Sequence, residues 1–177
     1  MPRYAAFLRG INVGKRRASK EALISCFEGI GLHDVTTFRA SGNVVFSTGR
    51  EPRAKLAARV ESALAEALGF EVIVFLRTET ELKKISGHEP FDPKLVEASK
   101  GKLQVAFLEK RPSRTATEAV TALASDDDRL ALGARELFWL PKGGLMESEL
   151  DQARIDELLG LATVRTMGTV QQLAARF

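Results

Sequence analysis

The chain has 177 residues, of which 45% are hydrophobic and 28% charged, with a formal net charge of +3 and one cysteine. This composition is typical of a globular protein and excludes a disordered, fibrous or disulfide-stapled chain. No apolar run is long enough to cross a bilayer, and the short apolar segment near the N-terminus runs into Arg9, which is unlike a signal peptide. We therefore expect a cytoplasmic protein with no membrane partner.

The first 77 residues carry alternating strand and helix signals. The apolar run 3–9 predicts a central strand, and Ser19 suits the N-cap of a helix that closes at Gly31. Two β-branched runs, 35–38 and 44–46, are separated by turn residues and predict a hairpin. A helix over 52–69 and a strand over 72–76 complete the order β-α-β-β-α-β of a ferredoxin-like sandwich.

The remaining residues repeat this order after a connector. In the connector, Thr78 suits the cap of a short helix through Ile85, and two prolines follow. We then expect strands at 103–108, 130–132, 136–140 and 162–165, with helices at 115–124, 150–159 and near the C-terminus. The predicted fold class is α+β, with two tandem ferredoxin-like halves, antiparallel sheets and a C-terminal helix. The predicted boundaries are 1–77, 78–100 and 101–177, and one larger α+β domain is the alternative.

Positive charge gathers near the N-terminus, where Glu21 is the first acidic residue. Six cations precede it, namely Arg3, Arg9, Lys15, Arg16, Arg17 and Lys20. A strand, a glycine-containing loop, consecutive cations and a helix start together favour an anion site. The loop is not a nucleotide P-loop, because its glycine spacing is one residue short and Arg16 stands where Ser or Thr would hold magnesium. It also lacks the third glycine of a dinucleotide fingerprint.

The predicted topology brings this loop to the hairpin turn. The first and second strands of such a sandwich are parallel with the third between them, so both loops emerge at the same end of the sheet. The expected ligand-binding residues of this rim are Arg9, Gly10, Asn12, Gly14, Lys15, Arg17, Arg39, Ser41, Gly42 and Asn43. Simpler interpretations remain: a plain hairpin turn at 41–43, a solvated cationic run at 15–17, and an Asn12 that bonds its own loop.

Signals for other chemistry are weak. The two histidines, His33 and His88, have no partners at metal-ligand spacing, so we expect no metal and no cofactor. Residues 126–128, three consecutive aspartates, predict a polar turn before a strand. Cys26 fits a small core residue, and Trp139 fits the core or the edge of an exposed loop.

Two motifs resemble those of a known bacterial family. Residues 8–14 (LRGINVG) and 41–46 (SGNVVF) are similar to the two signatures of the domain-of-unknown-function 1697 family, and segments 105–108, 139–141 and 165–170 resemble it less specifically. The resemblance implies an α+β fold of ferredoxin-like halves and no established activity. The chain departs from the family pattern at Lys15, where a second glycine is frequent. It departs again in segment 165–170, which lacks two amides and an indole.

We consider three functions. The first is binding of an anionic, phosphorylated small molecule, a nucleotide or a nucleic-acid backbone at the rim, with Arg165 and Thr169 of the C-terminal segment added. The second is an enzyme of unknown reaction on a small anionic substrate, which lacks an obvious general base. The third is a non-catalytic protein-interaction module. Recognition of RNA bases on the sheet is disfavoured, because Phe7 and Phe46 are expected in the core.

Overall fold

The computed structural model describes residues 1–39 and 42–177. The chain divides into two compact units, residues 1–84 with 173–177, and residues 85–172. Each unit holds one four-stranded antiparallel sheet with helices, so the structure confirms the α+β fold of two ferredoxin-like halves. Within the described residues, every helix is too short or too polar to traverse a bilayer.

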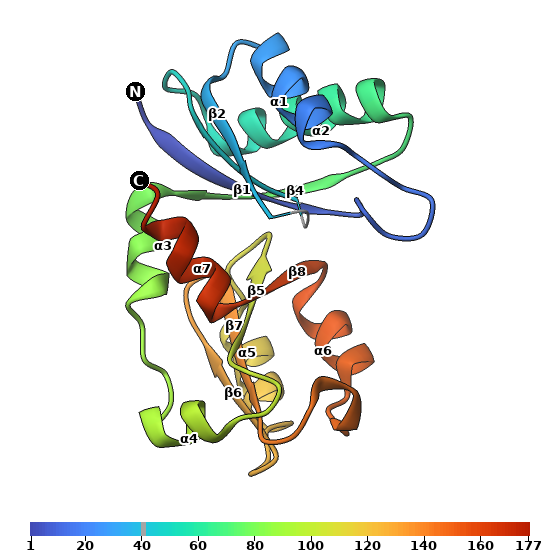
Figure 1. Ribbon diagram of the computed structural model, residues 1–177. Helices are drawn as coiled ribbons and strands as arrows, with labels where there is room; N and C mark the ends of the chain where they lie inside the picture. Colours follow the sequence, from blue (N-terminus) through green and yellow to red (C-terminus); the bar gives the residue numbers. More distant parts are fainter. Residues whose placement is uncertain (40–41) are drawn as a thin grey trace. The chain divides into compact units, whose positions relative to one another are not determined.

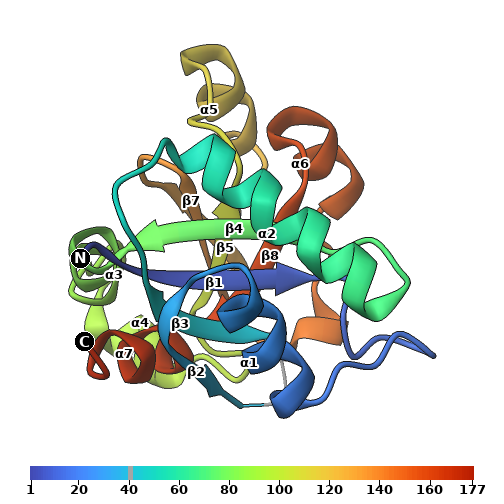
Figure 2. The same ribbon diagram turned by 90° about the horizontal axis from the view of Figure 1, so that it is seen from above.

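The first unit is a β-α-β-β-α-β sandwich. Its elements are β1 (Arg3–Arg9), α1 (Lys20–Gly29), β2 (His33–Phe38), β3 (Asn43–Ser47), α2 (Arg53–Leu68) and β4 (Ile73–Thr78). The sheet order is β2-β3-β1-β4, and all neighbouring strands are antiparallel. As predicted, β1 and β2 are therefore parallel to each other and flank β3. Helices α1 and α2 cover one face of this sheet (Figures 1 and 2).

Local chemistry fixes the ends of these helices and their packing. Helix α1 begins after Ser19, whose Oγ accepts a hydrogen bond from the backbone N–H of Ala22 at 3.1 Å. Helix α2 ends at Gly69 in the left-handed conformation, with φ of 79°. The apolar face of α1 meets the sheet at Phe27, whose ring lies edge-on to that of Phe46, with centroids 5.4 Å apart.

The second unit repeats the topology. Its elements are α4 (Pro93–Ala98), β5 (Gln104–Leu108), α5 (Arg114–Thr121), β6 (Asp128–Leu132), β7 (Glu136–Pro141), the 3-10 helix η1 (Leu145–Glu147), α6 (Gln152–Leu159) and β8 (Ala162–Thr166). The sheet order is β6-β7-β5-β8. Buried residues Val120 of α5 and Ile155 of α6 pack with Leu130 and Leu137 of the sheet in one apolar cluster. The division between the units falls inside α3 (Glu79–Ser86) and α7 (Met167–Ala174).

The connector differs in part from the sequence prediction. The predicted cap of α3 is confirmed, because Thr78 Oγ1 accepts from Glu81 N at 3.2 Å while the Glu81 carboxylate accepts from Thr78 N at 2.8 Å. Helix α4 was not predicted. The two prolines of the connector, Pro90 and Pro93, suggested a break, but Pro93 stands at the first helical position, where proline is favourable, and Asp92 caps the helix.

The C-terminal end of the chain also departs from the predicted boundaries, which assigned all of residues 101–177 to the second half. Residues 173–177 belong to the first compact unit, although they follow the second unit in the chain. The Arg3 guanidinium donates to the carbonyl oxygens of Phe177 at 3.0 Å and Arg176 at 3.3 Å, and it lies over the Phe177 ring. The end of the chain is thereby held at the start of β1.

Candidate functional site

The loop after β1 and the hairpin turn between β2 and β3 meet, as the topology predicted. Leu8 N donates to the carbonyl oxygen of Gly42 at 2.8 Å. The side chain of Ile11, which is 6% exposed, packs over Gly42. A Cβ placed on Gly42 would lie only 2.7 Å from Ile11 Cδ1, so the contact requires glycine at this position.

Three left-handed residues give the loop a compact shape. Gly10, Asn12 and Gly14 have φ values of 93°, 54° and 57°. The Oδ1 of Asn12 accepts from Ala18 N at 3.3 Å, and the Asn12 carbonyl oxygen accepts from the Arg17 guanidinium at 3.2 Å. Asn12 therefore stabilises its own loop, in agreement with its simpler sequence interpretation.

The tip of this loop carries exposed positive charge. Lys15, Arg16 and Arg17 are all exposed, and none of them forms an ion pair within the described part of the chain. The turn is closed by a hydrogen bond from Arg16 N to the Val13 carbonyl oxygen at 3.0 Å. The N–H groups of Gly14 and Lys15, at the tip, donate to no acceptor among the described residues. The loop thus presents cations and backbone donors together.

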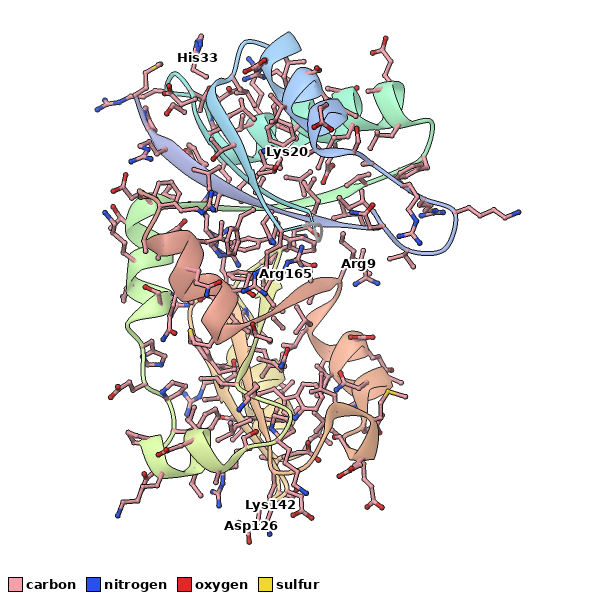
Figure 3. The ribbon with its side chains drawn as sticks, viewed as in Figure 1. Arg9, Lys20, His33, Asp126, Lys142 and Arg165 are labelled. Atoms are coloured by element: carbon pink, nitrogen blue, oxygen red, sulfur yellow. The ribbon has the colours of Figure 1, made fainter. Side chains whose placement is uncertain are left out.

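Arg9 and the start of α1 lie on either side of this tip in the chain. Figure 3 shows Arg9 at the end of β1 and Lys20 at the first residue of α1. Both are exposed. The Arg16 guanidinium lies 5.9 Å from the centroid of the Phe70 ring. This contact holds the Arg16 side chain against the body of the unit.

The hairpin contributes less to the surface than the sequence suggested. Arg39 is exposed, with φ of 58°, and its guanidinium lies 5.3 Å from the centroid of the neighbouring Phe38 ring. Asn43 is only 1% exposed, and its Nδ2 donates to the Phe38 carbonyl oxygen at 3.0 Å. Asn43 therefore holds the hairpin together and is not a surface donor. Ser41 lies outside the described residues.

The two C-terminal candidates, Arg165 and Thr169, belong to the second unit. The Arg165 guanidinium donates to Thr163 Oγ1 at 2.7 Å and to the Val164 carbonyl oxygen at 2.9 Å. Burial lowers the pKa of Arg165 to about 10, so the side chain is still protonated at neutral pH. Thr169 is buried at the start of α7, where its N–H donates to Thr166 Oγ1 at 3.2 Å and its own Oγ1 lies 3.0 Å from that same oxygen, within hydrogen-bonding distance. These contacts give both side chains a local structural role.

A polar cavity in the second unit was missed by the sequence reasoning. It has a volume of about 830 Å³ and includes the buried carboxylate of Asp128. The sequence predicted only a polar turn there. The alternation of β6 could have indicated this cavity residue, because Asp128 stands two positions before the buried Leu130 and therefore lies on the same face of the strand. Within the described residues, no three His, Cys, Asp or Glu side chains gather as a metal site requires.

The fold and these loops define the chain as a two-unit ferredoxin-like α+β protein with a cationic loop at the end of its first strand. Residues 1–138 match the model of the family described as "Protein of unknown function (DUF1697)", and the chain belongs to that family. The chain is also similar to the solved structure of the conserved bacterial protein SP0830 from Streptococcus pneumoniae. The TM-score is 0.74 at 23% sequence identity, over 99% of this chain and 98% of that one. This likeness shows the shared fold. No curated protein matches the chain.

Proposed function

We propose that the first unit binds a phosphate-bearing anion, whether a phosphorylated metabolite, a nucleotide or a nucleic-acid backbone, at the loop formed by residues 9–19. The observation that carries this proposal is the set of three consecutive exposed cations, 15–17, without acidic partners among the described residues. Three adjacent like charges repel one another, so they gain free energy when an anion lies between them.

The shape of the loop supports the same proposal. Hydrogen bonds from Arg16 N and Ala18 N close the loop on itself, so the backbone that carries the cations needs little ordering when a ligand arrives. The N–H groups of Gly14 and Lys15, which have no acceptor among the described residues, belong to a turn that contains a left-handed residue, and such turns bind anions in other proteins. The N-terminus of the ten-residue helix α1 follows directly and adds a partial positive charge.

The proposal is tested by the salt dependence of binding. A fluorescent single-stranded oligonucleotide and a fluorescent nucleoside triphosphate are titrated with the protein over a series of salt concentrations. If the three cations contact phosphates of the single strand, the logarithm of the association constant falls with the logarithm of salt concentration with a slope of about −2. The triphosphate arm shows whether a short ligand is enough.

A pair of variants that lose the same charge distinguishes binding at the loop from non-specific electrostatic binding to a basic protein. Alanine at positions 15, 16 and 17 removes the loop cations, and alanine at the exposed Lys94, Lys110 and Arg111 removes the same charge from the second unit. We expect the loop variant to lose most of the slope and the control to keep it. Equal affinity and equal slope in the two variants would show that the loop is not the binding site.

A further inference from the structure

The cavity with Asp128 in its lining lies at the open end of the β6–β7 hairpin, where β6 begins and β7 ends. Asp128 and Pro141 are paired residues at this end of the sheet, and Lys142 N donates to the Asp127 carbonyl oxygen at 2.8 Å just beyond them. Figure 3 shows Lys142 and Asp126 at this same end. The segment after β7 is also tied back to the residues before β5, because Gly101 N donates to the Gly143 carbonyl oxygen at 2.8 Å. The cavity therefore has a hydrogen-bonded wall.

Asp128 is an unusual residue for the inward face of a strand. It is only 4% exposed, yet its carboxylate forms no ion pair within the described residues. Its Oδ1 accepts two hydrogen bonds, from Trp139 Nε1 at 2.8 Å and from Ser148 Oγ at 2.7 Å. Buried carboxylates are normally paired with a cation, because burial alone opposes the charge.

The second oxygen of this carboxylate is available to a ligand. No described residue donates a hydrogen bond to Oδ2. Every fully buried side-chain oxygen or nitrogen of the described residues has a partner, so Oδ2, which has none among them, must keep some accessible surface, and Asp128 is one of the residues that line the cavity. The fixed Oδ1 holds the carboxylate in one orientation, and Oδ2 is left to accept a hydrogen bond from whatever enters.

The lining selects for a cation with an apolar body. Five of the lining side chains are acidic, and only two, Lys100 and Lys142, are basic. Lys142 is itself close to Asp127, with its Nζ 4.0 Å from Oδ1. Glu149, an exposed member of the lining, has no partner among the described residues. Leucine and proline side chains complete the walls. Acidic groups both inside and at the mouth suit a molecule with several ammonium groups joined by methylenes.

We propose that this cavity binds an aliphatic polyamine, with one ammonium group donating to Asp128 Oδ2 and another lying near Glu149. A metal ion fits the lining poorly, because no three acidic side chains among the described residues converge on a point. The volume of about 830 Å³ is within the range of small-molecule sites. This site is independent of the anion-binding proposal, since it lies in the other unit and has the opposite charge.

The protein carries its own reporter for this site. Trp139 is the single tryptophan, and its indole N–H donates directly to Asp128. Spermidine is titrated into the full chain at constant ionic strength while tryptophan emission is recorded, with sodium and magnesium salts as controls. We expect a saturable change with spermidine that the salts do not reproduce. An absent change, or one that magnesium produces equally, overturns the proposal.

Three variants locate the binding. Asp128→Asn keeps an oxygen acceptor for Trp139 and Ser148 but removes the charge, and it should weaken spermidine binding about tenfold or more. Asp126→Asn removes the same charge from an exposed neighbour outside the lining and should bind as the unaltered chain does. Glu149→Gln, which changes only an exposed side chain, should weaken binding severalfold. Unaltered binding by either Asp128→Asn or Glu149→Gln contradicts the proposal, and the latter variant decides the matter if the former does not fold.

Discussion

Replacement of Gly42 by alanine should destabilise the first unit more than the same replacement at another glycine that has a similar positive φ. The φ of Gly42 is 74°, and an added Cβ would lie 2.7 Å from Ile11 Cδ1 and 3.1 Å from Leu8 Cβ. Ordinary contacts of this kind begin near 3.4 Å. Ile11 can rotate in part, but Leu8 Cβ is fixed by its strand, so the contact cannot relax without moving the backbone.

The control is Gly69→Ala. Gly69 has nearly the same φ, 79°, but a Cβ added there would meet no other atom within 4 Å. Both variants carry the left-handed strain of about 1–2 kcal/mol, partly offset by the reduced freedom of the unfolded chain. The difference between them isolates overpacking, which typically costs about 1–3 kcal/mol. We therefore expect Gly42→Ala to lower the free energy of unfolding by about 1–3 kcal/mol more than Gly69→Ala.

Urea unfolding followed by far-ultraviolet circular dichroism measures these free energies. A double variant with Ile11→Ala gives a further check, since removal of the Ile11 Cγ1 and Cδ1 atoms relieves the shortest contact. In that background the cost of Gly42→Ala should fall toward that of Gly69→Ala. Equal costs for the two single glycine variants would refute the close packing of the loop against the hairpin turn.

Three other predictions concern local features. Thr78→Ala removes the cap of α3 and should lower the free energy of unfolding by about 1 kcal/mol, measured by the same urea titration. Burial, and to a smaller extent the nearby Glu66 carboxylate, raises the pKa of the Cys26 thiol, so iodoacetamide should react with it slowly at pH 8. Glu66→Gln removes the second cause and should speed the reaction, and an unchanged rate would contradict this. Arg3→Ala should speed amide hydrogen exchange at the chain end near Phe177, whereas unchanged exchange would show that this contact does not hold the C-terminus.

The sequence predicted the features that depend on nearby residues and on topology. Strand 3–9, the hairpin around 42 and the cap at Thr78 follow from apolar patterning and turn chemistry, and the structure confirms each. The meeting of the β1 loop with the hairpin followed because parallel β1 and β2 must place these loops at one end of the sheet.

Other features depend on contacts that the sequence does not display. Asn43 looks like a surface turn residue, but its burial follows from where the hairpin packs. The sequence places Asp128 in an acidic turn. Its hydrogen bond from the Trp139 indole N–H depends on the register of β6 against β7, which the sequence does not show. Helix α4 begins at a proline that, in the sequence alone, equally predicts a break. Arg77, which is 1% exposed, lies past the predicted end of its strand.

The anion-binding proposal is tested most directly by backbone amide chemical shifts during a titration of isotope-labelled protein with inorganic tripolyphosphate. We predict saturable shifts that are largest for Gly14 and Lys15, whose N–H groups have no acceptor among the described residues, and that extend over the loop 9–19. Loop amides that stay unchanged at saturating ligand, or largest shifts in the second unit, would contradict the proposal.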